Sequence, residues 1–360
     1  MNNSSGPVKL SCRHVWKVYA DEAAPYFKDE VERSDPEDLS QRMRNDGAIP
    51  AAVDISFDVH VGEIFVIMGL SGSGKSTVVR CLSRLVEPSH GAVFLDDQDL
   101  LQKSSKELID VRRHKMGMVF QSFGLMPHLT VLENIAFPLS LQGLPAREQH
   151  ERAARVIALV GLEGRENSFP QQLSGGQQQR VGIARSLAVE PELWFLDEPF
   201  SALDPLIRRQ MQDEFLRIQS ALKKSIVFIT HDFLEALRIA DRMMIMRDGL
   251  VVQVGTPAEL VTNPADDYVA EFTSDVPIAR VLRASDIMGP ATGLSAGAHR
   301  VHADTTLEGL LPELAKADAI AVTAGENIIG AITPKSVIAA LARGASDQPT
   351  IGGHADDDAA

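Results

Sequence analysis

The strongest chemical signal in the sequence is a glycine-rich segment, Gly69–Thr77, which reads GLSGSGKST. Glycines let the backbone turn its N–H groups inward around phosphate oxygens, and the dipole of a following helix favours the same anion. Lys75 is expected to reach the β- and γ-phosphates of a nucleotide, and the Ser76 hydroxyl to ligate Mg²⁺. The segment therefore predicts a P-loop. Its phosphate-binding residues would be Gly69, Ser71, Gly72, Ser73, Gly74, Lys75, Ser76 and Thr77.

A second candidate is the acidic pair Asp197-Glu198, which directly follows the apolar run Leu193–Leu196. In P-loop enzymes an aspartate in this context helps to hold Mg²⁺. A carboxylate immediately after it can orient or activate an attacking water. Acidic pairs at strand ends are commonly solvated turns, so this interpretation depends on the P-loop upstream. With that P-loop, the pair indicates hydrolysis of a bound nucleotide.

Three apolar runs would position this chemistry. Strands buried on both faces are apolar throughout, and Ile64–Met68, Leu193–Leu196 and Ile226–Ile229 fit that pattern. In open α/β sheets, ligands bind beyond the carboxyl ends of parallel strands. We therefore expect an α/β fold in which three strand ends converge on one site. The polar segments that follow the runs are Gly69–Thr77, Asp197-Glu198 and Thr230-His231-Asp232.

The other elements are predicted from periodicity and from helix breakers. Residues 8–19 are expected to form an edge strand. Residues from about 20 to 50 form an acidic insert, in which Asp35-Pro36-Glu37 begins a short capped helix. Residues 125–190 are rich in helical patterns. Asp204-Pro205 is a good helix start, and apolar residues at helical spacing continue from it to Leu222.

Composition excludes several classes of protein. The chain has 360 residues, of which 44% are hydrophobic and 23% charged, and its formal net charge is −14. Binding to phosphate backbones needs surfaces rich in Lys and Arg, so nucleic acid is not expected as a partner. Cys12 and Cys81 lie outside any CxxC pattern and are expected to be reduced thiols. No apolar core of signal-peptide length and no membrane-spanning apolar run is found, so a membrane role is expected only through a partner.

The segment Leu173-Ser174-Gly175-Gly176-Gln177, between the P-loop and Asp197, resembles the signature motif of ATP-binding-cassette (ABC) ATPases. The resemblance implies a RecA-like P-loop NTPase core with antiparallel β and helical subdomains. Other positions match the same family. Gln121 resembles the Q-loop glutamine, Ser201-Ala-Leu-Asp204 the D-loop, His231 the switch histidine, and Tyr19 the aromatic residue that the family places against adenine.

The resemblance also implies a mechanism. Two cassettes meet head to tail, so Ser174 and Gly176 would touch the γ-phosphate of ATP held by the partner's Lys75. Glu198 would polarise the attacking water, and ATP binding would close the dimer that hydrolysis reopens. The implied catalytic residues are Glu198, His231 and Gln121, the implied Mg²⁺ ligands are Ser76, Gln121 and Asp197, and the ATP contacts beyond the P-loop are Tyr19, Ser174, Gly175, Gly176, Gln177 and Asp204.

Longer segments resemble the ATP-binding subunits of bacterial glycine betaine/proline betaine uptake systems, over about residues 8–275. One departure is Pro199, where that subfamily often has Ala. The resemblance implies the ATP-hydrolysing subunit of an importer, peripheral on the cytoplasmic face of the bacterial inner membrane. It would act as a homodimer with permease subunits and a substrate-binding protein. The matching segments are Glu63–Thr77, Ser201–Arg208, Ile229–Asp232 and Val254–Pro257.

The chain is expected to have three regions: an ABC ATPase domain over 1–275, a single CBS-like module over 276–345, and a disordered tail over 346–360. CBS modules work in pairs, so this one would either pair across the dimer or be a remnant with a structural role. Sensing of ionic strength or of a nucleotide stays open. In the ABC family, the segment that follows Gln121 lines the groove for a permease helix.

Three alternatives remain at this point. An importer for an amino acid or another small solute would keep the same ATPase, because the permease and binding protein choose the cargo. A non-transport ABC ATPase, acting in DNA repair or on ribosomes, typically carries coiled-coil inserts or two fused cassettes, and this chain has neither feature. An ordinary kinase leaves the signature motif unexplained.

Overall fold

The computed structural model describes residues 6–27, 35–119, 124–201, 203–274, 276–292, 294 and 298–345. The chain divides into two compact units between Val254 and Gly255. The first unit carries two sheets, and the second carries a sheet of three strands. Within these ranges, none of the helices combines the length and apolarity needed to cross a bilayer.

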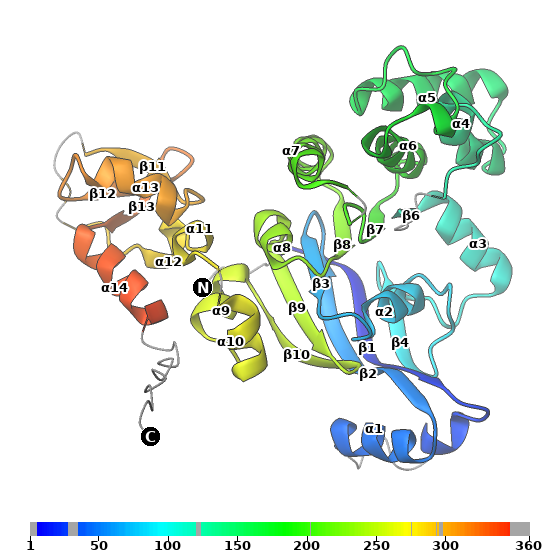
Figure 1. Ribbon diagram of the computed structural model, residues 1–360, viewed down its shortest axis with the longest axis horizontal. Coiled ribbons are helices and arrows are strands. Elements are labelled where there is room, and N and C mark those ends of the chain that lie inside the picture. The colour runs from blue at the N-terminus through cyan, green and yellow to red at the C-terminus, as the bar shows by residue number, and fades with distance from the viewer. Residues whose placement is uncertain are drawn as a thin grey trace, which may run out of the picture. The chain divides into compact units, whose positions relative to one another are not determined.

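The first unit contains a six-stranded sheet with the strand order β10-β9-β3-β8-β7-β6 (Figure 1). β3, β8 and β7 are parallel neighbours, and every residue in them is buried. The prediction that the three apolar runs form buried parallel strands is therefore confirmed. Their carboxyl ends lie at one edge of the sheet. The strands are β3 (Ile64–Met68), β6 (Met116–Val119), β7 (Leu193–Asp197), β8 (Ser225–Ile229), β9 (Arg242–Arg247) and β10 (Leu250–Gly255).

A second sheet has the strand order β2-β1-β4-β5. β1 (Val8–Tyr19) pairs antiparallel with β2 (Ile49–His60) on one side and with β4 (His90–Leu95) on the other, and β5 (Gln98–Asp99) follows β4. The prediction that residues 8–19 form an edge strand is wrong. Alternation of side chains along a strand distinguishes the two faces of a sheet, but it does not show which strands lie on either side.

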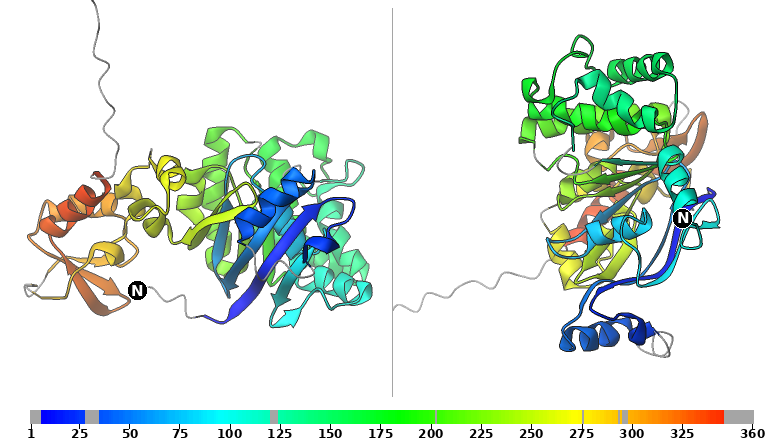
Figure 2. Two further views of the ribbon diagram at one scale, coloured as in Figure 1. Left: turned by 90° about the horizontal axis from the view of Figure 1, so that it is seen from below. Right: turned by 90° about the vertical axis from the view of Figure 1, so that its right-hand side faces the viewer.

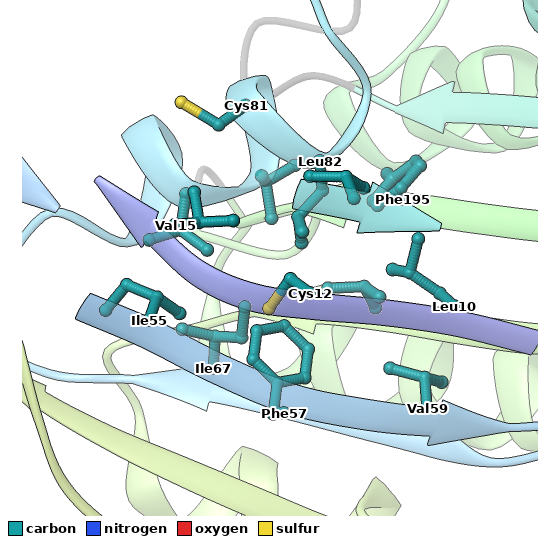
Figure 3. Close-up of a cluster of buried hydrophobic side chains, with 14 of the residues drawn as sticks. Leu10, Cys12, Val15, Ile55, Phe57, Val59, Ile67, Cys81, Leu82 and Phe195 are labelled. Atoms are coloured by element: carbon teal, nitrogen blue, oxygen red, sulfur yellow. The ribbon is translucent and has the colours of Figure 1, made fainter. Parts of the chain in front are cut away.

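The main hydrophobic core joins the two sheets, and α2 (Lys75–Leu82) contributes to it (Figure 3). Phe57 of β2 stacks on Phe65 of β3, with ring centroids 4.6 Å apart. Cys12 and Cys81 are free, which agrees with the predicted reduced thiols, and both are buried. Burial raises the pKa of each thiol to about 12. Neither cysteine is therefore a reactive thiolate at neutral pH.

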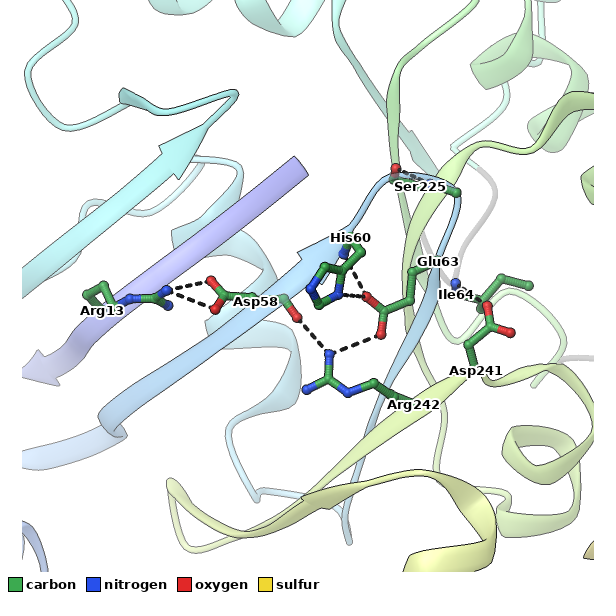
Figure 4. Close-up of polar contacts among 9 residues, drawn as sticks. Arg13, Asp58, His60, Glu63, Ile64, Ser225, Asp241 and Arg242 are labelled. Carbon is green, nitrogen blue, oxygen red and sulfur yellow. Dashed lines mark hydrogen bonds and ion pairs between the residues drawn. The ribbon is translucent and has the colours of Figure 1, made fainter. Parts of the chain in front are cut away.

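A polar network also joins the sheets, at the amino end of β3 (Figure 4). The buried Glu63 carboxylate accepts a hydrogen bond from the His60 backbone N–H at 2.6 Å and pairs with Arg242 at 3.1 Å. Arg242 also donates to the Asp58 carbonyl at 3.2 Å. The Asp58 carboxylate in turn receives two hydrogen bonds from Arg13 of β1, at 2.6 and 2.9 Å. The network satisfies a buried charge and ties β1, β2, β3 and β9 together.

The acidic insert between β1 and β2 forms a small structure of its own. The η1 turn (Ala24–Phe27) and α1 (Pro36–Asn45) belong to it. The Asp35 side chain caps α1 by accepting from the Glu37 backbone N–H at 2.9 Å, as predicted. Leu39 and Met43 pack with Trp16 of β1 in a separate cluster. α1 lies at one end of the first unit and α4–α6 at the other (Figures 1 and 2).

The helical block predicted over residues 125–190 and the helix predicted after Asp204 are both present. Three helices of the first unit begin with capping boxes. In each box, the Ser or Thr side chain accepts from the backbone N–H of the third helical residue, and the side chain of that residue accepts from the backbone N–H of the Ser or Thr. The boxes pair Ser104 with Glu107, Thr130 with Glu133, and Ser174 with Gln177. The helices are α3 (Ser105–His114), α4 (Val131–Leu141), α5 (Ala146–Leu159), α6 (Gly175–Leu187), α7 (Pro205–Leu222) and α8 (Phe233–Ile239), with a 3₁₀ turn η2 (Pro170–Gln172).

The second unit surrounds a sheet in which β11 is parallel to β12 and β12 is antiparallel to β13. The compact unit starts at Gly255, ahead of the domain boundary expected near residue 275, since α9 and α10 pack on each other and α9 packs on α11. Its elements are α9 (Pro257–Thr262), α10 (Asp267–Thr273), α11 (Ile278–Val281), α12 (Ala284–Ile287), β11 (Arg300–His302), α13 (Leu307–Leu314), β12 (Ile320–Ala324), β13 (Asn327–Ile332) and α14 (Pro334–Ala345).

An ion-pair cluster in the first unit predicts a pH-dependent stability. The Lys9 ammonium, nearly buried, bonds Asp96 at 2.6 Å and also contacts Glu192, while Lys115 bonds Asp96 at 3.0 Å. Burial acts to raise the pKa of Asp96, but the bonds from Lys9 and Lys115 outweigh it and hold that pKa below its usual range. A lowered carboxyl pKa stabilises the fold at neutral pH, and this contribution is lost as the pH falls through that pKa.

Replacing Lys9 by Met is expected to lower the free energy of unfolding by about 2 kcal/mol at neutral pH, since a charged hydrogen-bond donor is lost. The difference from the unmodified chain should shrink on acidification, because protonated Asp96 no longer attracts Lys9. Urea denaturation at a series of pH values measures both. A difference that stays constant into the acid range would contradict this assignment.

Candidate nucleotide-binding and hydrolysis site

The P-loop lies between β3 and α2, which is the strand-loop-helix context that the motif requires. Gly69 (φ +148°) and Gly74 (φ +98°) adopt backbone conformations that other residues rarely take. A Cβ at Gly69 would overlap the carbonyl oxygen of Met246, and one at Gly74 that of Ala51. The loop therefore lies close to β9 of the six-stranded sheet and to β2 of the other sheet.

Lys75 begins α2 and is 6% exposed. Its ammonium donates to the carbonyl oxygens of Gly69 at 2.8 Å and Leu70 at 2.9 Å. Burial lowers the pKa of Lys75, and the carboxylates of Glu198 and Asp197 oppose that shift. Asp197 ends β7 and Glu198 follows it, so the charges of the two predicted motifs act on each other.

The two predicted magnesium ligands that the structure describes lie side by side. The Ser76 hydroxyl donates to the Asp197 carboxylate at 3.1 Å. Burial raises the pKa of Asp197, although the hydrogen bond from Ser76 opposes the shift. A hydroxyl and a carboxylate fit Mg²⁺, which prefers oxygen ligands and is usually bound by one or two protein groups together with phosphates.

The structure brings Glu198 and His231 together. Glu198 directly follows β7, and its backbone N–H donates to the Ile229 carbonyl at the end of β8 at 3.0 Å. Its φ of +46° is unusual for a residue with a side chain. The Glu198 carboxylate lies 3.2 Å from Nδ1 of His231. A carboxylate and an imidazole at this distance can transfer a proton between them.

The signature segment forms the start of α6. Ser174 caps this helix by accepting from the Gln177 backbone N–H at 3.3 Å, and the Gln177 side chain accepts from the Ser174 N–H at 3.0 Å. Gly175 and Gly176 form the first turn. A Cβ on Gly176 would lie 2.9 Å from Cγ2 of Ile207 on α7, so the segment packs closely beside the helix that follows the D-loop.

The D-loop aspartate, Asp204, caps α7. Its carboxylate accepts from the backbone N–H groups of Leu206 at 3.2 Å and Ile207 at 3.1 Å. Ser201 turns back on Glu198, because its hydroxyl donates to the Glu198 carbonyl at 3.0 Å. The D-loop is thus attached to the segment that carries the candidate catalytic carboxylate.

Tyr19 lies at the end of β1 and is 45% exposed. Its partner across the ladder is Ile49 of β2, which is 64% exposed. Partners across an antiparallel pair share one face of the sheet. Ala51, two residues further along β2, faces Gly74 of the P-loop. Trp16, the other aromatic residue in this part of β1, is 1% exposed and belongs to the core.

One predicted site residue, Gln121, falls outside the described residues. Among the described residues, a hollow of about 340 Å³ is formed by side chains from α3, β6, α4 and α6. Three arginines contribute to its wall, and Phe137 and Leu141 of α4 are 37% and 47% exposed. Burial lowers the pKa of two of the arginines, Arg112 and Arg185. The lining residues are Ile109, Arg112, Arg113, Met116, Gly117, Met118, Met126, Phe137, Pro138, Leu141, Arg185, Ser186 and Val189.

Sequence reasoning missed two residues at the site, Ile49 and Arg208. The Arg208 guanidinium bonds the Phe200 and Leu203 carbonyls and the Asp232 carboxylate. Arg208 lies inside a segment that serves only to recognise the family, and nothing in its spacing indicates these contacts. Ile49 stands at the end of the insert, and only the register of β1 with β2 places it beside Tyr19.

The fold and this site define a P-loop NTPase of the ABC type, and comparisons with known proteins agree. Residues 52–201 match the ABC transporter family model. The chain is 50% identical over 336 residues, or 93% of its length and 97% of the relative's, to a trimethylamine N-oxide transport system ATP-binding protein of Pelagibacter ubique. It is 49% identical over 280 residues, or 78% of its length and 69% of the relative's, to a glycine betaine/proline betaine transport system ATP-binding protein of Escherichia coli.

Solved structures show the same relationship. A dimeric ATP-binding cassette in a post-hydrolysis state, bound to ADP and Pi, has a TM-score of 0.57 and 32% identity, covering 69% of this chain and 98% of that one. The chain therefore belongs to the ATP-binding subunits of ABC transporters, and it is an ATPase. Membership in this family argues against the kinase and non-transport alternatives.

Substitutions at two glycines of the P-loop test whether the close approach to Ala51 of β2 matters for stability. Gly72 and Gly74 both have positive φ, +84° and +98°, but a Cβ on Gly72 would meet nothing within 4 Å. Gly72→Ala is expected to lower the free energy of unfolding by about 1–2 kcal/mol, from backbone strain alone. Gly74→Ala should cost clearly more, because the Ala51 carbonyl must also move. Thermal or urea unfolding of both variants checks this order, and equal losses would contradict it.

Proposed function

We propose that the chain powers a bacterial importer whose cargo is a small methylated amine: glycine betaine, proline betaine or trimethylamine N-oxide. The observation that carries this proposal is the match at 50% identity along almost the whole of both chains to a subunit named for trimethylamine N-oxide transport. The match to a betaine subunit supports the same chemical class. A permease and a substrate-binding protein would select the cargo, with the ATPase peripheral on the cytoplasmic face of the inner membrane.

In this proposal, ATP binds between two copies of the chain. Lys75 and the P-loop N–H groups hold the β- and γ-phosphates, while Ser174 and Gly176 of the partner subunit approach the γ-phosphate from the start of its α6. The N–H groups and dipole at that helix start favour an anion. Tyr19, beside Ile49, offers an exposed apolar face to the adenine. Support for a dimer comes from the dimeric cassettes among the solved relatives.

Hydrolysis is assigned to the residues that follow β7 and β8. Glu198 orients the attacking water and takes up its proton as the new P–O bond forms and the bond to the β-phosphate oxygen breaks. His231, 3.2 Å from Glu198, holds the γ-phosphate. Ser76 and Asp197 would hold Mg²⁺, which neutralises phosphate charge when it is bound. Gln121 is assigned to the same metal and water by its resemblance alone.

The hollow between α3, β6, α4 and α6 is assigned to the permease. It presents apolar side chains, among them Met116 and Met118, in a wall that also carries arginines. An apolar surface of this kind suits a short helix from a membrane subunit. Closure of the ATPase dimer would then move that helix and change which side of the membrane the permease opens to.

Residues 276–345 are assigned to a single CBS-like module that pairs with the same module of a second copy. What supports pairing is the exposure of large apolar side chains on this unit: Ile338 of α14 is 66% exposed, and Ile328 and Ile329 of β13 are 42% and 41% exposed. A pair of such modules would let ionic strength or a nucleotide act on transport.

The first test of the function is uptake. Cells with the unmodified chain, with Glu198→Gln, or with the surface control Glu151→Gln would be compared for uptake of labelled glycine betaine, proline betaine, trimethylamine N-oxide, choline and histidine, at low and high osmolarity. Loss of a general base lowers the rate of hydrolysis by about 10²- to 10⁴-fold. We therefore expect Glu198→Gln to abolish uptake of at least one methylated amine and Glu151→Gln to leave it unchanged.

Loss of histidine uptake alone would identify an amino-acid importer instead. Unchanged uptake of all five solutes would overturn the methylated-amine assignment. An uptake rate that depends on osmolarity, and loses this dependence when residues 276–345 are removed, would support the regulatory role of the module.

The permease assignment has its own test. Leu141→Asp places a carboxylate in the hollow, and Leu222→Asp places one at the end of α7, at a leucine that is 37% exposed and outside it. We expect Leu141→Asp to abolish uptake and co-purification with the membrane subunits while ATP binding persists. Leu222→Asp should preserve all three. Co-purification of the Leu141→Asp chain at the normal level would move the docking surface elsewhere.

A further inference from the structure

The guanidinium of Arg208, on the first turn of α7, reaches two separate segments of the site. Its Nε donates to the Phe200 carbonyl at 3.3 Å, and its Nη2 donates to the Leu203 carbonyl at 3.2 Å. Its Nη1 donates to the Asp232 carboxylate at 3.2 Å. One planar group is therefore bonded to both ends of the segment 200–203 and to the residue that follows His231.

The residues that Arg208 contacts are close in sequence to the residues assigned to hydrolysis. Phe200 follows Glu198 by two positions, and the Ser201 hydroxyl donates to the Glu198 carbonyl at 3.0 Å. Asp232 is adjacent to His231, which lies 3.2 Å from the Glu198 carboxylate. The bonds of Arg208 thus close a ring that runs from Glu198 through the D-loop and Asp232 to His231, and back to Glu198.

Asp232 links Arg208 to α8 because both of its carboxylate oxygens are held by hydrogen bonds. One carboxylate oxygen of Asp232 accepts from the Glu235 backbone N–H at 3.1 Å and caps α8, while the other receives the bond from Arg208. A second contact joins the same two helices, since the Gln212 amide donates to the buried Glu235 carboxylate at 2.9 Å. The Gln212 contact holds α7 on α8, and the Arg208 contact holds the loops that precede these helices.

We propose that Arg208 is a positioning residue for ATP hydrolysis, which couples the D-loop to the Glu198–His231 pair. The proposal rests on the roles assigned above to Glu198 and His231. The D-loop leads into α7, and α7 packs beside the signature segment. A change in the position of the D-loop would therefore be passed through Arg208 to the distance between Glu198 and His231. Only a guanidinium has donors in the fixed fork that these three acceptors require, and a lysine ammonium can bond fewer of them at once.

The test compares variants of the full-length chain in the assembled transporter. Arg208→Gln removes the fork, and Arg208→Lys keeps the charge. Asp232→Asn removes the acceptor charge but retains a good helix cap. Arg209→Gln changes the exposed neighbouring arginine on the same helix. Phosphate release is measured against ATP concentration, with thermal unfolding and nucleotide binding recorded for each variant.

A displacement of reacting groups by about 1 Å can cost about 10²-fold in rate. We expect Arg208→Gln to lower kcat by about 10- to 100-fold with KM within about twofold, and Arg208→Lys to recover part of that loss. Asp232→Asn should lower kcat in the same sense. The double variant should lose little beyond the larger single loss, because the effect of Asp232 on the ring depends on its bond to Arg208, which is already lost in Arg208→Gln.

Three results would overturn the proposal: a kcat for Arg208→Gln within twofold of the unmodified chain, an equal loss for Arg209→Gln, or additive losses for Arg208→Gln and Asp232→Asn. If Arg208→Gln fails to fold, Asp232→Asn tests the same bond by itself. A Glu198→Gln chain with the kcat of the unmodified chain would instead overturn the role given to Glu198, so the two failures are distinguishable.

Discussion

The parallel pairing of β3, β8 and β7 is the constraint on which the site depends. All three strands are buried along their whole length, so a shift in register would leave buried backbone N–H and C=O groups at their ends without partners. Their fixed register places the ends of β7 and β8 together, as the bond from the Glu198 N–H to the Ile229 carbonyl shows. The phosphate loop, the acidic pair and the histidine owe their closeness to this pairing, although they lie far apart in the sequence.

Much of this arrangement could be predicted from the sequence because apolar runs and polar ends are local signals. The P-loop, the three buried strands and the caps of α1 and α7 followed from residue types alone. The place of β1 inside its sheet did not, since pairing with β4 depends on distant residues. The contacts of Arg208 did not either, because a long flexible side chain can turn in many directions and only the tertiary structure selects one.

Two of the residues predicted to contact ATP, Ser174 and Asp204, cap helices in this chain. Asp204 and Asp232 accept from the first N–H groups of α7 and α8, and Ser174 does so at α6. A helix start that is satisfied by its own side chain is rigid before any ligand arrives. The signature segment, the D-loop and the segment after β8 are therefore held by local bonds, and the long-range contacts have only to align them.

The pairing of Tyr19 with Ile49 also defines where the acidic insert is attached. The chain leaves β1 at one member of this pair and re-enters β2 at the other, so the ends of the insert are brought together by the ladder itself. The entropy cost of closing a loop rises only slowly with its length. Residues could therefore be gained or lost between these two points over evolution without shifting the register of β1 and β2. The length of the insert can therefore differ between related proteins while the nucleotide site beside its ends stays the same.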